Sequence, residues 1–339
     1  MSIEALLDSA AKLSHAPVLV VGDVIADRYH FGLPTRISRE APVLILEHVG
    51  ETTIPGGAAN AAANVVALGG DVVLVGVVGD DTEAEMLRVQ VTALGIDPGG
   101  MIVEAGRVTT SKTRVFAGPQ RRGQQVVRLD RATRSAVEGG TRAALLETGL
   151  AALARSRALL ISDYGYGACD PGLIGALVDA ATQSRLPVLV DTQGDLRAYR
   201  GASVVTPNLA ELEAWAGERL VDAAAVAGAA GRLRAEIGAE AVLCTRGGDG
   251  MTLVTGGEPV HLPVARRADV ADVAGAGDTV AATIAMGLAA GIPLRVACLL
   301  ADCAASVVVQ KPGAATCSPD ELRDAIREIA VETLAAGGL

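Results

Sequence analysis

The chain has few aromatic residues and no long apolar run. Aromatic side chains make up 2% of its 339 residues, although half of the residues are hydrophobic. Alanine, valine, leucine and glycine must therefore build the core, and this composition suits closely packed helices on a valine-rich parallel sheet. A chain of this length can bury a substantial core, as one large domain or as two medium ones.

Cysteine is scarce as well. The five cysteines form no C-x-x-C pair, have no histidine near them and in several cases lie in apolar runs: Cys169, Cys244, Cys298, Cys303 and Cys317. This usage predicts reduced, buried thiols in a cytoplasmic protein. No charged-then-apolar leader opens the chain and no apolar stretch reaches transmembrane length, so we expect no membrane partner.

The chain has fewer basic residues than acidic ones. The chain has 29 lysines and arginines against 39 aspartates and glutamates, and its net charge is −10. Such a surface would repel a nucleic-acid duplex, which argues against a nucleic-acid partner. Small anionic ligands stay compatible with this charge, because a few local cations are enough to hold them.

Short β-rich runs alternate with longer helical patterns along the chain. The runs lie at 17–21, 72–78, 158–161, 188–190, 203–205 and 241–244, and the helical patterns at 60–68, 83–94, 171–184 and 280–290. This alternation predicts an α/β fold, a mostly parallel sheet with helices on both faces. Ligands of such sheets bind beyond the carboxyl ends of the strands. Polar residues follow these ends at Asp23, Asp163, Asp191, Asn208 and Thr245.

Two stretches, 28–55 and about 100–130, break the alternation. They contain β-type runs without intervening helices, at 43–46, 113–116 and 125–129. We expect antiparallel strands inserted into a single domain that covers 1–339, since no linker or repeat interrupts the chain. The inserted strands would form a lid that closes over the cleft, or a structural extension or dimer-forming edge.

The most informative segment, 272–279, reads Asp-Val-Ala-Gly-Ala-Gly-Asp-Thr. A glycine-rich turn that opens a helix directs backbone N–H groups and the positive end of the helix dipole at one point, and so holds an anion. Asp278 stands beside this turn as a candidate base, which phosphoryl transfer to a hydroxyl requires. An ordinary helix start would have a similar sequence.

Further polar groups precede other helices or follow strands. Asp23 and Asp27, with Gly56, Gly57 and Asn60, would suit a polyhydroxylated ligand, although each of them alone is more typical of a turn. Asn208 and Glu211 share one helix face, where they would hold a hydrated Mg²⁺ or form a capping box. The segment 245–250 is polar and glycine-rich, and a hairpin turn has the same composition.

In this order and spacing, these groups resemble the motifs of the ribokinase-like (PfkB) family of sugar kinases over nearly the whole chain. Gly56-Gly57-x-x-Asn60 is similar to its sugar-site signature, and Asp272 to Asp278 to its D-x-x-G-A-G-D signature. Within the family the chain most resembles bacterial heptose 7-phosphate kinases of lipopolysaccharide precursor synthesis, their kinase half only. Supporting stretches are 22–24, 27–29, 36–38, 40–43, 124–130 and 206–208.

The resemblance implies a three-layer α/β/α fold with a β lid, and a role for each motif. Asp278 would be the general base, with Gly275 and the N–H groups of Ala276 and Gly277 as an anion hole. Sugar hydroxyls would be bound by Asp23, Asp27, Gly56, Gly57 and Asn60. ATP and Mg²⁺ would be bound by Asn208, Glu211, Thr245, Gly247 and Gly250, with Mg²⁺ held by Asn208 and Glu211 through water. Asp272, near Gly313, would belong to a possible monovalent cation site, for K⁺. The family's lid strands often pair two subunits, so a homodimer is expected.

For a heptose 7-phosphate the acceptor would be the anomeric hydroxyl, and distant cations would have to bind the existing phosphate. The candidates are Arg36, Arg39, Lys112, Arg114, Arg121, Arg122 and Arg128, and a solvated lid face would explain the same residues. We expect no fused nucleotidyltransferase domain.

Three departures from the heptose kinases stand in the sequence. Tyr166 and Gln193 replace lysines, and Asp302 replaces an asparagine. A kinase for another sugar or sugar phosphate, or a non-catalytic sugar- or nucleotide-binding regulator, therefore stays open. A Rossmann oxidoreductase is disfavoured because no G-x-G-x-x-G follows the first strand.

Overall fold

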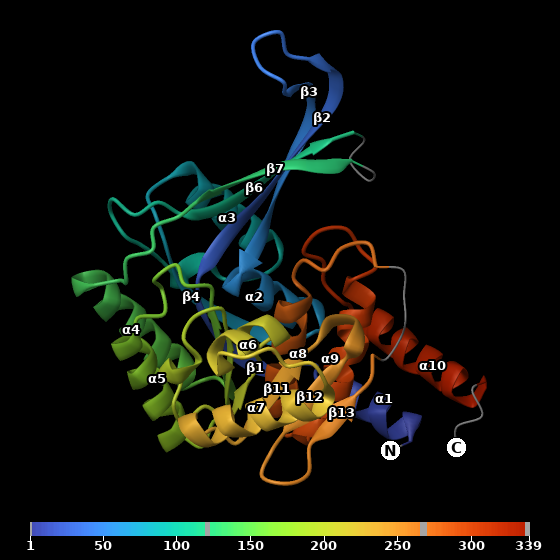
Figure 1. Cartoon of the computed structure of the whole chain (residues 1–339). Coiled ribbons are helices and arrows are strands. Elements are labelled where there is room, and N and C mark those ends of the chain that lie inside the picture. The colour runs from blue at the N-terminus through green and yellow to red at the C-terminus, as the bar shows by residue number, and fades with distance from the viewer. Residues whose placement is uncertain (1, 119–122, 265–269, 336–339) are drawn as a thin grey trace.

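The computed structural model describes residues 2–118, 123–264 and 270–335, and its centre is a nine-stranded sheet (Figure 1). The strand order is β13-β12-β11-β10-β9-β8-β1-β4-β5. The pairs from β11 to β5 are parallel, whereas β12 and β13 add an antiparallel edge. The strands are β1 (Pro17–Gly22), β4 (Asp71–Val78), β5 (Met101–Val103), β8 (Ala158–Asp163), β9 (Val188–Thr192), β10 (Val204–Val205), β11 (Ala241–Thr245), β12 (Met251–Val254) and β13 (Val260–Leu262).

Helices cover both faces of this sheet, as the alternation predicts. Val18 and Val20 of β1 point into one hydrophobic cluster, and Leu19 and Val21 point into the other. The first cluster includes residues of α2 (Ala58–Ala67), α3 (Thr82–Ala93), α8 (Ala276–Ala289), α9 (Leu294–Val308) and α10 (Pro319–Ala335), and α1 (Ile3–Ala11) packs against it. The second includes residues of α4 (Gly139–Leu153), α5 (Pro171–Gln183), α6 (Leu209–Ala216) and α7 (Ala223–Ile237). Short 3-10 helices are η1 (Pro98–Gly100), η2 (Leu196–Ala198) and η3 (Gly247–Asp249).

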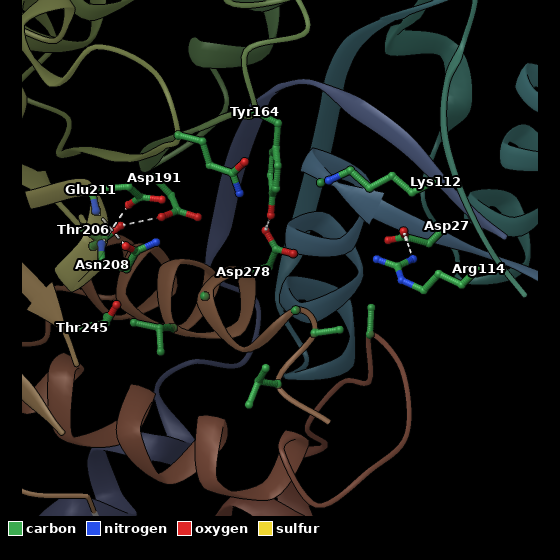
Figure 2. Close-up of a pocket in the computed structure, with 18 residues that line it drawn as sticks. Asp27, Lys112, Arg114, Tyr164, Asp191, Thr206, Asn208, Glu211, Thr245 and Asp278 are labelled. Atoms are coloured by element: carbon green, nitrogen blue, oxygen red, sulfur yellow. Dashed lines mark hydrogen bonds and ion pairs between the residues drawn. The ribbon is translucent and has the colours of Figure 1, made fainter. Parts of the chain in front are cut away.

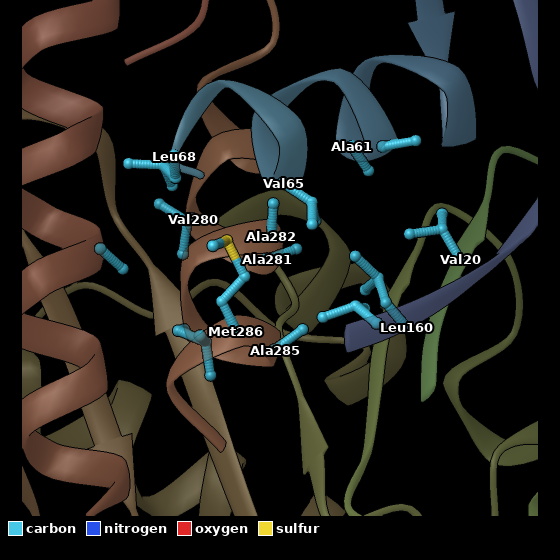
Figure 3. Packing of buried hydrophobic residues seen from close by; sticks show 14 of the residues in the cluster. Val20, Ala61, Val65, Leu68, Leu160, Val280, Ala281, Ala282, Ala285 and Met286 are labelled. Carbon is cyan, nitrogen blue, oxygen red and sulfur yellow. The ribbon is translucent and has the colours of Figure 1, made fainter. Parts of the chain in front are cut away.

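Small side chains replace aromatics in the core. Ala281, Ala282 and Ala285 of α8 pack with Val65 of α2 (Figure 3). A Cβ atom at Gly287 would lie 2.7 Å from the Cβ of Ala297, so α8 and α9 approach closely only because glycine is there. Among the described residues, each helix is too short or too polar to span a bilayer.

A four-stranded lid projects from the body (Figure 1). Its order is β3-β2-β6-β7, with β2 (Val24–Ile37), β3 (Leu44–Gly57), β6 (Thr110–Ala117) and β7 (Gln124–Arg131). The predicted lid is confirmed, but its limits differ from the sequence prediction. It begins at Val24, directly after the first core strand, and residues 101–103 pair with β4 in the main sheet instead of joining the lid.

Candidate active site

A cavity of about 310 Å³ lies between the lid and the carboxyl edge of the main sheet (Figure 2). The predicted site residues that line it are Asp27, Gly57, Asn208, Glu211, Thr245, Gly275, Gly277 and Asp278. They come from the lid, from the end of β11, from the start of α6 and from the start of α8. The fold therefore brings segments that are far apart in the sequence to one cavity.

Asp278 lies in the first turn of α8 and is 3% exposed. Asn60 donates a hydrogen bond from Nδ2 to Oδ2 of Asp278 at 2.6 Å, and the Tyr164 hydroxyl donates to Oδ1 at 2.8 Å. Gly275 precedes the helix with a φ of 77°, a left-handed conformation that favours glycine. A Cβ atom there would lie 2.6 Å from Nδ2 of Asn60, so the turn and the carboxylate need this glycine.

The electrostatics suit a general base. Burial, and then the negative charge of Asp191, raise the pKa of Asp278 to about 7. A carboxylate with this pKa holds an abstracted proton far better near neutral pH than an exposed aspartate does. The hydrogen bonds from Asn60 and Tyr164 partly oppose the shift, because they stabilise the charged form.

A buried polar chain supports Asn60. Asn64 donates from Nδ2 to the carbonyl oxygen of Asn60 at 3.0 Å, and Thr279 donates from its hydroxyl to Oδ1 of Asn64 at 2.8 Å. Sequence reasoning missed Asn64, Thr279 and Tyr164. The i, i+4 spacing of the two asparagines was a usable signal, whereas nothing local to Tyr164 indicates a contact with α8.

The end of the cavity that lies away from the lid is acidic (Figure 2). Asn208 and Glu211 form the capping box of α6: the Glu211 N–H donates to Oδ1 of Asn208, and Oε2 of Glu211 accepts from the Asn208 N–H. Both residues also line the cavity, so the capping interpretation and a ligand role are compatible. Burial raises the pKa of Glu211, and burial together with Glu211 raises the pKa of Asp191 to about 7. Thr206 donates to Asp191 at 3.1 Å.

The lid contributes the cations of the cavity. Arg114 forms an ion pair with Asp27, and a Cβ atom at Gly56 would lie 2.3 Å from Oδ2 of Asp27. Lys112 Nζ lies 4.9 Å from the ring centroid of Tyr164. Burial lowers the pKa of Lys112. Figure 2 shows Asp278 between these lid residues and the acidic group around Asn208.

A comparison with protein families identifies the family of this chain. The model of the pfkB family of carbohydrate kinases matches residues 16–321. The chain belongs to the pfkB carbohydrate kinase family. It is a phosphotransferase with a hydroxyl acceptor.

Curated relatives align along nearly all of the kinase. It is 42% identical to the bifunctional protein HldE of Azorhizobium caulinodans, over 97% of this chain and 68% of the relative. It is 46% identical to the HldE of Halorhodospira halophila, over 91% of this chain and 63% of the relative. The kinase thus spans about two thirds of the length of these proteins.

Solved structures confirm the ribokinase-like fold. Phosphofructokinase-2 from Escherichia coli, in complex with potassium, superposes with a TM-score of 0.76 at 19% identity, over 94% of this chain and 99% of that one. Arabidopsis thaliana ribokinase, complexed with ribose and ATP, superposes with a TM-score of 0.69 at 20% identity, over 93% and 98%.

Asp23 has a different environment in the kinase from the expected one. It is 2% exposed and accepts hydrogen bonds from the backbone N–H groups of Tyr164, Tyr166 and Ala168 at 2.8–3.0 Å. These contacts hold the loop after β8 in place, and that loop carries Tyr164 into the cavity. Asp27, four residues further along, is the carboxylate that lines the cavity.

The other basic residues predicted to bind the substrate phosphate do not line the cavity in the part of the chain that the structure describes. Arg128 lies opposite Arg114 in the register of β6 and β7, but forms an ion pair with Asp130 at 2.9 Å. Arg36 and Arg39 lie towards the lid tip, away from the cavity lining. Arg121 and Arg122 lie outside the described residues.

The two glycines of the predicted nucleotide loop shape a hairpin. Gly247 and Gly250 lie between β11 and β12, and a Cβ atom at Gly250 would lie 2.1 Å from the carbonyl oxygen of Leu262. Thr245, at the end of β11, forms a bridge to Asn208 and lines the cavity. The only tryptophan of the chain, Trp215, lies further along the chain from Asn208, in α6.

Asp272 fastens the loop that leads into α8. Its Oδ1 accepts from the Ala274 N–H at 2.9 Å, and its Oδ2 accepts from the Gly313 N–H at 3.1 Å. Ala276 is the first residue of α8. The expected K⁺ site at Asp272 stays a prediction.

The three residues that differ from the heptose kinases, Tyr166, Gln193 and Asp302, lie in different surroundings. Tyr166 is 7% exposed, and its ring centroid lies 5.6 Å from Lys112 Nζ and 4.9 Å from the Arg134 guanidinium carbon. Gln193 lines the cavity, and Asp302 is buried in α9. The aromatic ring in place of a lysine therefore still attracts positive charge to that position.

Proposed function

We propose that this kinase transfers the γ-phosphoryl group of ATP to the anomeric hydroxyl of heptose 7-phosphate. The product would be the 1,7-bisphosphate, a precursor of ADP-heptose and lipopolysaccharide. The observation that carries the proposal is the cavity itself, in which Asp278 lies between an acidic end and the lid cations Lys112 and Arg114. The alignment with the HldE proteins supports it.

In this proposal Asp278 accepts the proton of the acceptor hydroxyl. That hydroxyl takes the place of the Tyr164 hydroxyl at Oδ1, while Asn60 keeps the carboxylate oriented through Oδ2. The N–H groups of Ala276 and Gly277, at the positive end of α8, stabilise charge on the transferring phosphoryl group.

ATP and Mg²⁺ belong to the acidic end, which Asn208, Glu211 and Thr245 line. Burial, and then the neighbouring charge of Glu211, raise the pKa of Asp191 to about 7. A divalent cation would relieve the repulsion between these carboxylates, and the residues present fit Mg²⁺. The capping box uses Oε2 of Glu211, which leaves the second carboxylate oxygen for a hydrated ion. When bound, Mg²⁺ neutralises charge on the phosphates.

The sugar belongs to the lid end. Asp27 is held by its ion pair with Arg114, and the missing side chain at Gly56 leaves room for its carboxylate. It would accept hydrogen bonds from sugar hydroxyls, and Gly57 would let the sugar approach the backbone closely. Lys112 and Arg114 would bind the 7-phosphate, since charge-assisted hydrogen bonds are the strong ones for phosphate. In this assignment Arg36 and Arg128 have weaker support than Lys112.

The test is ATP-dependent ADP release across a panel of acceptors: heptose 7-phosphate, unphosphorylated heptose, fructose 6-phosphate and ribose. We expect heptose 7-phosphate to give the highest kcat/KM, with the new phosphate on the anomeric carbon by phosphorus NMR. If ribose or a free hexose outperforms every phosphorylated sugar, the heptose assignment is wrong. Sugar binding without turnover on any acceptor would favour the regulator instead.

Four finer proposals accompany this function. The domain covers 1–339, and the kinase acts in the cytoplasm. A K⁺ ion binds near Asp272 and Gly313, which would appear as activation by potassium chloride over sodium chloride. Two copies pair through their lids, since exposed apolar residues gather there, including Ile37, Leu44 and Leu129. Sedimentation equilibrium of the wild type against Leu129→Lys measures the dimer.

A further inference from the structure

Two histidines and a glutamate gather on the lid face that points away from the cavity. His30 lies on β2, and His48 and Glu51 lie on β3. Side chains alternate along a strand, so His30 and Asp27, three residues apart, point to opposite faces. Arg28, on the His30 face, contacts Glu83 of α3 at 3.1 Å, which confirms that this face is not the cavity side.

The three side chains are close enough to share one ion. Their ligand atoms all lie within 4.8 Å of one another, and Nδ1 of His30 lies 3.2 Å from Oε2 of Glu51. Ligands that bind a tetrahedral Zn²⁺ at roughly 2.0–2.1 Å are separated by about 3.3 Å, so this pair already has the required spacing. The ligand nitrogen of His48 is within 4.8 Å of the other two ligand atoms, and its side chain is exposed, so it has room to rotate towards them.

A β-bulge brings the third ligand to this face. Residues 48 and 51 are three apart, and in a regular strand they would point to opposite faces. In the register of β2 and β3, Phe31 pairs with Gly50 and Gly32 pairs with His48, so Val49 is an extra residue. The bulge turns His48 to the face of Glu51 and His30, as bulges commonly re-aim a side chain.

We propose that His30, His48 and Glu51 bind one divalent transition-metal ion of the zinc class, with water in the remaining position. Two imidazoles and one carboxylate form a donor set that suits Zn²⁺ and disfavours Mg²⁺, which prefers oxygen ligands. The site is therefore distinct from the Mg²⁺ proposed for the catalytic cavity. It links β2 to β3 at a point where the register shifts.

Charge around the cluster permits this assignment. Arg28 lies 3.9 Å from Oε2 of Glu51, but its shorter ion pair is with Glu83. An incoming cation can therefore take Glu51 while Arg28 keeps a partner. The side chain of Glu51 is 55% exposed and that of His30 is 26% exposed, so an ion can enter from solvent.

The experiment is a Zn²⁺ titration by calorimetry of the whole chain after treatment with a chelator, with excess Mg²⁺ present to occupy the carboxylates of the cavity. We expect one Zn²⁺ per chain, and a rise in the melting temperature on binding. His48→Ala and Glu51→Gln should each weaken this binding by at least about 10- to 100-fold, since loss of even an outer partner of a metal site has that effect.

The chain contains four histidines, and the other two supply matched controls. His15→Ala and His261→Ala should leave the titration unchanged, and His48→Ala should keep its kinase activity. Co²⁺ should give a spectrum without the thiolate charge-transfer band that a cysteine site would show. The proposal is overturned if the wild type binds no Zn²⁺, if binding survives His48→Ala and Glu51→Gln, or if the cobalt spectrum shows thiolate.

Discussion

The start of α8 and the lid end of the cavity are built in different ways. At the start of α8, Gly275 is the N-cap and Gly277 and Asp278 lie in the first turn, so backbone geometry fixes their spacing. At the lid end, Asp27 and Arg114 meet across two strands whose register places Asp27 opposite Lys112. The start of α8 therefore suits the phosphoryl transfer proposed for Asp278, whereas the lid end suits the choice of acceptor. Mutations at these two places should change different kinetic constants.

The largest effect should come from Asp278→Asn. Asparagine can keep both hydrogen bonds, accepting from Asn60 and donating to the Tyr164 hydroxyl, but it cannot accept the proton. We expect kcat to fall by about 10²- to 10⁴-fold, the usual contribution of a general base, with little change in KM for ATP. Steady-state kinetics at saturating Mg²⁺ measures both constants.

The melting temperature of the same variant provides a control for folding. Burial raises the pKa of Asp278 from 3.8 to about 7, so between these pH values the folded chain holds a proton that the unfolded chain has released. The stability that this proton contributes is lost as the pH rises through about 7. The amide of Asp278→Asn cannot ionise, so the variant should melt at a higher temperature than the wild type at pH 8. A lower melting temperature would contradict the buried-charge argument.

A smaller effect, confined to the acceptor, should come from Lys112→Gln. One lost charge-assisted hydrogen bond to a phosphate is worth about 1.5–3 kcal/mol, or roughly 10- to 100-fold in KM for the phosphorylated sugar. The KM for ATP and the kcat should change little. Arg131→Gln, an exposed lid residue paired with Glu83, is the matched control. Equal losses for phosphorylated and unphosphorylated sugars would show that Lys112 does not bind the phosphate.

The smallest effect should be a shift of the pH profile in Asp191→Asn. The negative charge of Asp191 is the second cause, after burial, of the raised pKa of Asp278. Without it the acidic limb of kcat/KM, which follows ionisation of Asp278, should move to lower pH. Asp249→Asn removes the same charge from an exposed side chain and should leave the limb in place. If the limb does not move in Asp191→Asn, the charge of Asp191 does not raise the pKa of Asp278, and the prediction is wrong.

Residues within one short segment were predictable from the sequence. The glycine turn before Asp278 and the Asn208–Glu211 capping box are local, since each depends on backbone geometry over three or four residues. Strand–helix alternation predicted the body for a similar reason, because the period of apolar residues reflects local structure.

Contacts across long sequence separations were not predictable. Asp23 and Asp27 look equivalent beside the first strand, but Asp23 is turned towards N–H groups more than 140 residues away. The lid cations could not be ranked either, because the register of β6 against β2 decides which of them faces the cavity. A shift of one residue would send Lys112 to the opposite face.

The scarcity of aromatic residues also has an optical consequence. Trp215 is the only indole of the chain, and within the described residues its buried N–H has no hydrogen-bond partner. It lies in α6, which Asn208 caps and whose first turn contains Glu211. Fluorescence excited at the red edge of the tryptophan band therefore comes from this helix alone. The kinase carries a native, label-free reporter on the helix whose N-terminus lines the end of the cavity proposed for ATP and Mg²⁺, and no tryptophan in the lid segments.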